Sequence, residues 1–269
     1  MSSMIKLSIM FKCPHCNAQL TQNEHSWVCL NKHSFDISKQ GYTNLFVSNS
    51  TRTLGDHPDM IKARHMFLEA GHYAFLRDAL IEIFDQLKLN HCVDLGCGEG
   101  YYTNALANSQ TQWIGLDLSK AALKIASKSS SVTYFCASIA ETPLMDKSMD
   151  GALCIFAPYN LDEVYRIVKA DGYFITVNPG PRHLYGLKEA LYDEVRLNPS
   201  NTIEDPRFHL ITSKILNHDL FLDSGDMIQN LLTMTPYRFK TSPTALDRLK
   251  LKDTLETELS FIIELYQVH

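Results

Sequence analysis

The stretch VDLGCGEG at residues 93–100, followed by GLDL at residues 115–118, decides the fold of this chain. An apolar strand that carries Asp94 leads into a loop with glycine at every second position, namely Gly96, Gly98 and Gly100. A second apolar strand ends in Asp117, about 20 residues after the first glycine, which is the length of one strand–helix–strand unit. The two stretches therefore predict a nucleoside-binding unit at the start of a parallel sheet.

The same stretch indicates which ligand this unit binds. Glycine lets the backbone approach a ligand too closely for a Cβ, and Asp117 can accept hydrogen bonds from both ribose hydroxyls. The spacing is G-x-G-x-G rather than G-x-G-x-x-G, and no phosphate-binding lysine follows, which disfavours NAD and ATP. We therefore expect S-adenosylmethionine, a nucleoside that carries a sulfonium and an amino acid. The alternative is a structural turn without a ligand. It is disfavoured because the glycines and both acids, Asp94 and Asp117, all fit a nucleoside-binding site.

Short apolar segments alternate with helical segments beyond residue 90. Strands are expected at Cys92–Leu95, Trp113–Leu116, Thr133–Cys136, Gly151–Phe156 and Tyr173–Val177, and helices at Tyr102–Ala107, Lys120–Ser127 and Asp162–Val168. This alternation is typical of an α/β fold with a doubly wound, mostly parallel sheet. Two further strands, at Phe208–Ile215 and Glu256–Tyr266, flank a helix at Gly225–Leu232 and would close one edge as an antiparallel pair. The prediction is a seven-stranded sheet.

A metal-ligand pattern, C-x2-C-x12-C-x3-H, occupies the N-terminal region. Its members are Cys13, Cys16, Cys29 and His33. Four soft or borderline ligands close a tetrahedral zinc site and leave no position for water, so one structural zinc per chain is expected. His15 and His25 are less favoured ligands. Zinc modules often bind nucleic acid, although stabilisation of a segment too poor in apolar residues to fold alone is the simpler alternative.

The composition limits where the protein works and how it is divided. The chain has 269 residues, is 45% hydrophobic and carries a net charge of −5 with seven cysteines. No apolar stretch is long enough to span a membrane and no signal peptide is evident, so a reducing cytoplasm is expected. A basic excess of seven against five in residues 1–70 still allows a local basic face. We expect a zinc-binding module over 1–48, a linker and helical lead-in over 49–90, and a methyltransferase domain over 91–269.

Three loops at the carboxyl ends of the predicted strands bear on the chemistry. Ser138 stands where many class I methyltransferases have an acid that contacts adenine. In this chain Ser138 or backbone atoms must therefore make the contact with adenine. The loop at 157–160, APYN, resembles the Asn-Pro-Pro-Tyr signature of amino-group methylases but lacks its Asn-Pro start, which is evidence against exocyclic-amine chemistry. The loop at 178–184, NPGPRHL, is expected to present Arg182 and His183 to the active face, the alternative being an ordinary turn with both side chains solvated.

These motifs together match one family. The matching stretches are CPxC at 13–16, Cys29 with His33, FD at 35–36, GYxNL at 41–45, GHY at 71–73, DLGCGEGYYT at 94–103, PGPRHL at 179–184 and MTP at 234–236. The chain resembles, nearly end to end, the bacterial large-subunit ribosomal RNA guanine-N1 methyltransferases of the RlmA type. The resemblance implies a class I S-adenosylmethionine-dependent fold, zinc on the four ligands above, and a homodimer whose cleft takes an RNA hairpin. It does not fix which guanine is modified.

The resemblance also implies contacts to the cofactor from Tyr73, the loop Gly98–Gly100, Asp117 and His183. The full candidate cofactor site comprises Tyr73, Asp94, Gly96, Gly98, Glu99, Gly100, Asp117, Ser138 and His183. Guanine N1 carries a weakly acidic proton, so a base or a group that stabilises the anion must assist methyl transfer, and His183 and nearby carboxylates are candidates. The expected phosphate contacts are Lys12, Lys32, Arg52 and Arg64.

Two other functions remain open at this point. A small-molecule methyltransferase of the same fold would have no need of a zinc module ahead of the helical lead-in. A non-catalytic zinc RNA-binding protein on a methyltransferase-like body is opposed by the intact Asp94, glycine loop and Asp117.

Overall fold

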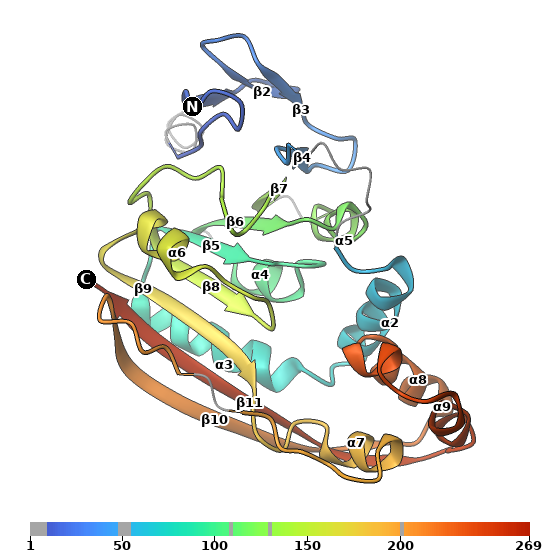
Figure 1. The fold of residues 1–269 in the computed structure, drawn as a ribbon. Coiled ribbons are helices and arrows are strands. Elements are labelled where there is room, and N and C mark those ends of the chain that lie inside the picture. Colours follow the sequence, from blue (N-terminus) through green and yellow to red (C-terminus); the bar gives the residue numbers. More distant parts are fainter. Residues whose placement is uncertain (1–9, 48–54, 108–109, 129–130, 200–201) are drawn as a thin grey trace.

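The central feature of the computed structural model is an eight-stranded sheet of order β10-β11-β9-β8-β5-β6-β7-β4 (Figure 1). The structure describes residues 10–47, 55–107, 110–128, 131–199 and 202–269. Its five central strands are parallel and largely apolar, as expected for strands covered on both faces. They are β5 (His91–Leu95), β6 (Gln112–Asp117), β7 (Val132–Cys136), β8 (Met149–Ile155) and β9 (Val168–Pro179). All five strands predicted from the alternation are confirmed.

The order of these strands reverses between β5 and β8. The chain runs outward from β5 through β6 to β7, and then returns to β8 and β9 on the other side. The connecting helices are α4 (Tyr101–Leu106), α5 (Lys120–Ala126) and α6 (Leu161–Ile167). The loops that follow β5 and β8 therefore lead away from each other, which opens a crevice at the carboxyl ends of the strands where ligands bind in folds of this type.

The predicted antiparallel pair at one edge is also confirmed. It consists of β10 (Phe208–Leu222) and β11 (Leu255–Val268), and β11 continues antiparallel to β9. Between the two strands lie α8 (Gly225–Thr233), η1 (Pro236–Phe239) and α9 (Pro243–Lys250), while α7 (Tyr185–Leu191) follows β9. The sequence predicted α8 but not α7, η1 or α9. These three lie beyond the regular alternation of short strands and helices that made the equally short α4, α5 and α6 recognisable.

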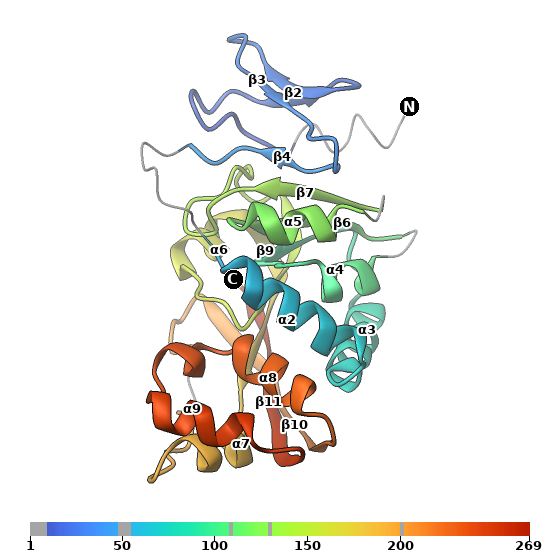
Figure 2. The same cartoon turned by 90° about the vertical axis from the view of Figure 1, so that its right-hand side faces the viewer.

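Two helices lead into the sheet, as expected for the helical lead-in over residues 49–90. They are α2 (Pro58–Glu69) and α3 (Ala74–Leu87), and α3 buries Leu76, Leu80 and Phe84 against the sheet. Helix α2 packs against α8, so that α2 and the insertion between β10 and β11 together form one helical lobe (Figure 2). Within the described residues, no helix is both long and apolar enough to cross a membrane.

The N-terminal region forms a second, small sheet. Its antiparallel strands are β1 (Leu20–Gln22), β2 (Ser26–Cys29) and β3 (Ser34–Asp36). The next strand, β4 (Thr43–Asn44), pairs in parallel with β7 and extends the large sheet. The prediction of seven strands is therefore corrected to eight, because a two-residue strand has no detectable pattern in the sequence.

The zinc-binding head, residues 10–47 as described, is packed directly onto the large sheet. Phe11 and Trp27 are buried against Phe135 of β7, with ring centroids 4.7 Å apart for Phe11 and Phe135 and 5.4 Å apart for Trp27 and Phe135. Backbone hydrogen bonds join Lys12 to Pro143 at 2.8 Å and Leu45 to Cys136 at 2.9 Å. The predicted boundary at residue 48 lies in the segment 48–54, outside the described residues, and stays a prediction.

Candidate functional site

The four predicted zinc ligands come together in the head. Cys13 and Cys16 belong to one turn, Cys29 ends β2, and His33 precedes β3. Their ligand atoms all lie within 4.8 Å of one another. The Sγ atoms of Cys16 and Cys29 are 3.7 Å apart, and His33 Nδ1 lies 3.5 Å from Cys13 Sγ and 3.4 Å from Cys29 Sγ.

These distances are those of a tetrahedral zinc site. Zn–S bonds of about 2.3 Å and Zn–N bonds of about 2.0–2.1 Å place two sulfurs about 3.8 Å apart, and a sulfur and a nitrogen about 3.6 Å apart. The residues present therefore fit zinc, with His33 coordinating through Nδ1. All four positions are filled by protein ligands, so the metal is structural and holds the two halves of the head together.

The glycine loop after β5 has the conformation that its sequence requires. Gly96, Gly98 and Gly100 have φ values of 82°, 55° and 76°, in the left-handed region that glycine adopts without strain. A Cβ on Gly96 would lie 2.7 Å from the Cβ of Ala157, so only glycine lets the loop after β5 meet the loop after β8. A Cβ on Gly98 would contact only Arg64 at 3.6 Å, which shows that the space beside this backbone is open to a ligand.

Asp117 lies at the end of β6 beside this loop. One carboxylate oxygen accepts a hydrogen bond from the Gly98 amide at 2.9 Å, and the other accepts one from the Ser119 amide at 2.6 Å. Burial raises the pKa of the Asp117 carboxyl, and these two amides oppose that effect. Each oxygen keeps further lone pairs for a ligand, so the geometry fits an acceptor of ribose hydroxyls.

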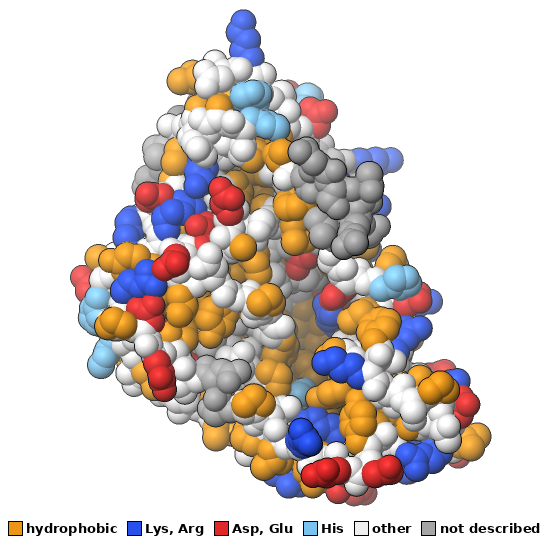
Figure 3. All heavy atoms as spheres, viewed as in Figure 1, with side chains coloured by type: hydrophobic (Ala, Val, Ile, Leu, Met, Phe, Trp, Pro, Cys, Tyr) orange, Lys and Arg blue, Asp and Glu red, His pale blue; other side chains and the backbone are white. Residues whose placement is uncertain are grey.

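A cavity of about 740 Å³ opens at the point where the strand order reverses. Figure 3 shows the hollow between the body of the sheet and the helical lobe, with apolar side chains in its wall. The lining is shared among the glycine loop, the ends of β6 and β8, the loop after β9, and helix α2. Residues 234–237 between α8 and α9 complete it. The volume is within the range of ordinary cofactor sites, about 300–1,000 Å³.

Four buried polar atoms, each on a residue that lines this cavity, have no hydrogen-bond partner among the described residues. They are Asp94 Oδ1, Glu99 Oε2, Tyr101 Oη and Tyr102 Oη. A buried polar atom without a partner costs free energy, so such a cluster indicates a polar ligand that is bound in the working protein. Carboxylate acceptors together with phenol hydroxyls suit the amino and carboxylate groups of an amino acid, as in S-adenosylmethionine.

The carboxylates of Asp94 and Glu99 each also contact a second side chain of the protein. Thr103 donates a hydrogen bond to Asp94 Oδ2 at 2.5 Å, and His65 Nδ1 lies 2.9 Å from Glu99 Oε1. Burial raises the pKa of Asp94 to about 7 and also raises the pKa of Glu99, where His65 opposes the shift. His65 lies on α2, so its contact with Glu99 fastens this helix to the glycine loop.

His183 closes the far wall of the cavity. It is buried beside Tyr73 and Phe261, and its Nδ1 accepts a hydrogen bond from the Ser260 amide at 3.3 Å. Burial lowers the pKa of His183 to about 3, with a smaller contribution from Lys188. The ring is therefore neutral, and because Nδ1 accepts, its proton is on Nε2. Such a ring donates a hydrogen bond to a ligand oxygen and is poorly suited to removing a proton.

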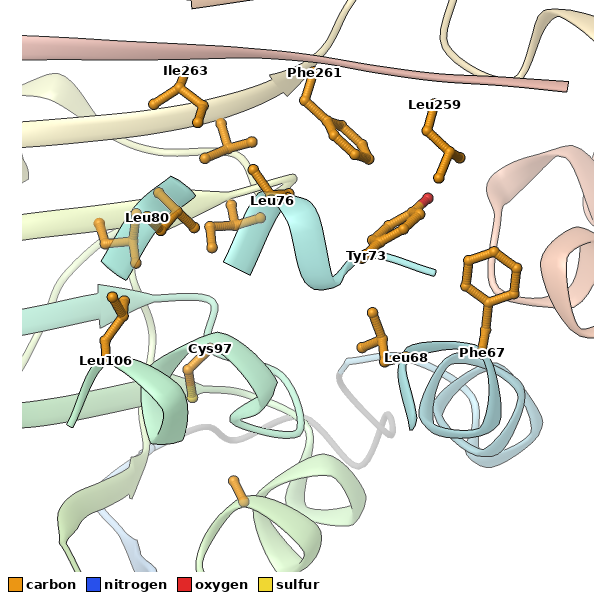
Figure 4. Packing of buried hydrophobic residues seen from close by; sticks show 14 of the residues in the cluster. Phe67, Leu68, Tyr73, Leu76, Leu80, Cys97, Leu106, Leu259, Phe261 and Ile263 are labelled. Atoms are coloured by element: carbon orange, nitrogen blue, oxygen red, sulfur yellow. The ribbon is translucent and has the colours of Figure 1, made fainter. Parts of the chain in front are cut away.

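Tyr73 is fixed in the same wall. It lies at the start of α3, between Phe261 of β11 and Phe67 and Leu68 of α2 (Figure 4). Its ring centroid is 5.0 Å from that of Phe261 and 5.4 Å from that of Phe67. Eight of the nine candidate cofactor residues thus line or border the cavity: Tyr73, Asp94, Gly96, Gly98, Glu99, Gly100, Asp117 and His183.

Three residues singled out from the sequence, namely Ser138, Arg182 and Arg64, have surroundings that the sequence did not predict. Ser138 does not line the cavity, and its hydroxyl accepts a hydrogen bond from the Ala140 amide, while the next residue, Ile139, forms the wall. Arg182 turns away from the cavity to a bidentate ion pair with Glu258. Arg64, a predicted phosphate contact, lies in the cavity wall and pairs with Asp56, and its contact with RNA stays a prediction.

The other predicted phosphate contacts lie on the zinc-binding head or outside the described residues. Lys32 is exposed and Lys12 is partly exposed, whereas Arg52 lies outside the described residues. Sequence reasoning also missed wall residues, chiefly Phe156 at the end of β8 and Tyr237 in η1. A signal for Phe156 existed, because it directly precedes the loop after β8, at the edge where ligands bind. Tyr237 follows the MTP stretch at 234–236 but carries no motif of its own.

Comparisons with known proteins agree with this geometry. Residues 11–52 match the zinc-ribbon family described as RlmA, N-terminal, and residues 93–176 match the methyltransferase domain family. A 23S rRNA (guanine(748)-N(1))-methyltransferase of Streptomyces fradiae is 31% identical over 249 residues, 88% of each chain. A Bacillus subtilis (strain 168) protein with the provisional name 23S rRNA (guanine-N(1)-)-methyltransferase YxjB is 34% identical, over 74% of this chain and 75% of that one.

Proposed function

The chain belongs to the family of 23S rRNA (guanine-N1)-methyltransferases, and from this premise we propose that it transfers a methyl group from S-adenosylmethionine to N1 of a guanine in 23S rRNA. The observation that carries the proposal is the conjunction of two sites in one body. A Cys3His zinc cluster and a cavity that fits S-adenosylmethionine lie in parts of the chain that are packed together. A small-molecule methyltransferase would leave the zinc head without a role.

The residues of the cavity divide the work of binding. Asp117 accepts the ribose hydroxyls, and the open backbone at Gly98 allows the nucleoside to lie against the loop. Asp94 and Glu99 offer their unpartnered oxygens to the cofactor amino group. Tyr73 and the Nε2–H of His183 face the amino-acid end or the acceptor from the other wall. When bound, S-adenosylmethionine supplies an electrophilic methyl group on its sulfonium.

Proton removal from guanine N1 does not fall to His183. A neutral imidazole whose Nδ1 already accepts a hydrogen bond, and whose pKa is about 3, cannot hold that proton. Burial raises the pKa of Asp94 to about 7 and also raises the pKa of Glu99, but the unpartnered oxygens of both are assigned to the cofactor amino group, so neither carboxylate is assigned as the base. His183 instead suits stabilisation of negative charge that develops on an oxygen.

The head and the assembly complete the proposal. The zinc head presents Lys32 and Lys12 and is fixed to β7, so it can hold an RNA hairpin at a set distance from the cavity. A homodimer with a shared RNA cleft and a cytoplasmic location follow from the family resemblance and from the substrate. Analytical ultracentrifugation tests the dimer, since a monomer at assay concentration would exclude it.

Incorporation of a tritiated methyl group into protein-free, unmodified 23S rRNA tests the activity, with 16S rRNA from the same source as the matched control. We expect labelling of 23S rRNA alone, and its loss in the Asp117→Ala variant. Equal labelling of both RNAs, or labelling of neither, would contradict the proposal.

A further inference from the structure

Phe156 combines two unusual properties at the end of β8. Its φ is 54°, in the left-handed region that bulky residues rarely adopt. Its side chain is also 42% exposed, although it lines the cavity. Strained backbone and exposed aromatic surface each cost free energy, and such strain persists mainly at functional sites.

The backbone of Phe156 is held in this conformation from both sides. Its amide donates a hydrogen bond to the Val177 carbonyl of β9 at 3.0 Å. The carbonyl of the next residue, Ala157, accepts one from the Cys154 thiol at 3.3 Å, and the Cβ of Ala157 abuts Gly96 of the glycine loop. The position of the ring is therefore tied to the cofactor loop on one side and to β9 on the other.

The ring of Phe156 rests on a buried aromatic cluster. Its centroid is 5.2 Å from Phe261, 6.3 Å from Tyr73 and 6.4 Å from His183, and the His183 ring is tilted by only 20° from it. Tyr73, His183 and Phe261 are at most 7% exposed. Phe156 is thus the member of this cluster whose surface is open to the cavity, and the others support it from behind.

We propose that Phe156 is the platform on which the acceptor guanine stacks during methyl transfer. The inference rests on the proposed function, because it assumes a purine as acceptor. Guanine N1 lies in the pairing edge of the base, so a guanine in a folded RNA must be turned out of its stack before it can react. A turned-out base loses its stacking neighbours, and an exposed aromatic ring replaces them.

The place of Phe156 in the fold matches this role. The cofactor site lies on the β5–β6 side of the reversal in strand order, and Phe156 stands next to it at the end of β8. A base stacked there is held between the glycine loop and the loop after β9, with its edge towards the cofactor. Stacking fixes the plane of the base, which an in-line displacement requires.

The test compares three variants with the same 23S rRNA substrate. Phe156→Leu keeps an apolar side chain but removes the aromatic face, whereas Phe156→Tyr keeps the face. Phe221→Leu is the matched control, because Phe221 is 58% exposed on β10 and outside the cavity. Methylation kinetics give kcat/KM, and calorimetry gives the dissociation constant of S-adenosylmethionine for each variant.

We expect Phe156→Leu to lower kcat/KM by about 10- to 100-fold, with cofactor affinity unchanged within twofold. Phe156→Tyr should retain activity within about threefold, and Phe221→Leu should match the wild type. Full activity of Phe156→Leu would overturn the inference while leaving the proposed function intact. A parallel loss of cofactor affinity in Phe156→Leu would also overturn it, since the ring would then support the cofactor pocket. Failure of the wild-type protein to methylate 23S rRNA would refute the proposed function instead.

Discussion

Asp117 shows how a single side chain organises the cofactor site. The sequence predicts the role from the position of this acid after the second strand, and the structure adds that its oxygens also bind the amides of Gly98 and Ser119. The residue therefore shapes the loop that it shares with the ligand. Removing it affects both the acceptors for ribose and the conformation of the glycine loop.

Replacing Asp117 with alanine should weaken S-adenosylmethionine binding. Ribose hydroxyls left without an acceptor cost about 1–3 kcal/mol, or roughly ten- to hundredfold in the dissociation constant. Isothermal titration calorimetry measures this directly. Asp219→Ala, at an exposed position of β10, is the control and should bind as the wild type does. Unchanged affinity in Asp117→Ala would show that the ribose lies elsewhere.

His183 makes a prediction about pH. Its pKa is lowered to about 3 in the folded protein, whereas the unfolded chain binds the proton near the ordinary value of about 6.5. Below pH 6.5 the unfolded state therefore binds one more proton than the folded state, and stability falls as the pH falls towards 3. This residue should cost about 2 kcal/mol of unfolding free energy between pH 7 and pH 5.

Urea unfolding of His183→Gln at the two pH values tests this. The variant should lose about 2 kcal/mol less than the wild type over the interval. His209→Gln, at an exposed position, should keep the wild-type pH dependence. The same pH dependence in His183→Gln and the wild type would mean that His183 is accessible to protons in the folded state.

At the scale of elements, the sequence is most informative where a pattern is long and local. The strands β5 to β9 each contain a short, mainly apolar run, and the zinc ligands are spaced within 21 residues, so both could be predicted. Strand β4 and helix η1 are too short to give a period, and they form because distant segments pack against them.

The site follows the same rule. The glycine loop and Asp117 were recognised because the ligand contacts lie within one strand–helix–strand unit. The direction of Arg182 could not be predicted because its ion-pair partner, Glu258, is 76 residues away in the sequence. Ser138 lies outside the cavity wall, where its hydroxyl accepts a hydrogen bond from the nearby Ala140 amide. The position of Phe156 before the loop after β8 can be read from the sequence, but its positive φ and its exposed ring cannot.

The head gives the prediction at this scale. Cys29→Ser removes one of four zinc ligands, so the protein should lose its single zinc and the strands β1 to β3 should unfold. Elemental analysis measures the metal, and limited proteolysis within residues 10–40 measures the unfolding. Cys136→Ala, a buried cysteine outside the cluster, should keep one zinc.

Cofactor affinity in Cys29→Ser should stay within a few-fold of the wild type. The reason is that, in the part of the chain that the structure describes, the cavity is lined only by residues from Gly55 onward. A full zinc content in Cys29→Ser would contradict the ligand set. A loss of cofactor binding in step with the metal would contradict the separation of the two sites.

At the scale of the whole molecule, three parts are packed together, and two of them, the sheet and the helical lobe, enclose the cavity. The zinc head is fixed to β7 through Phe11, Trp27 and Phe135, the parallel sheet provides the glycine loop, and the helical lobe closes the far side through residues 234–237. The chain has a net charge of −5, so recognition of RNA depends on local basic surface and on shape rather than on overall charge. The central claim is that this arrangement directs the methyl group to one atom of one base.

The chemical identity of the methylated nucleoside tests that claim most directly. Unmodified 23S rRNA is incubated with the protein and S-adenosylmethionine, and then analysed by mass spectrometry of nucleosides and by reverse transcription. We predict one 1-methylguanosine per 23S rRNA and a single new stop, because a methyl group on N1 blocks the pairing edge of the base. Methylation at the guanine exocyclic amine, at N7 or at a ribose hydroxyl, or RNA without any methyl group, would contradict the account.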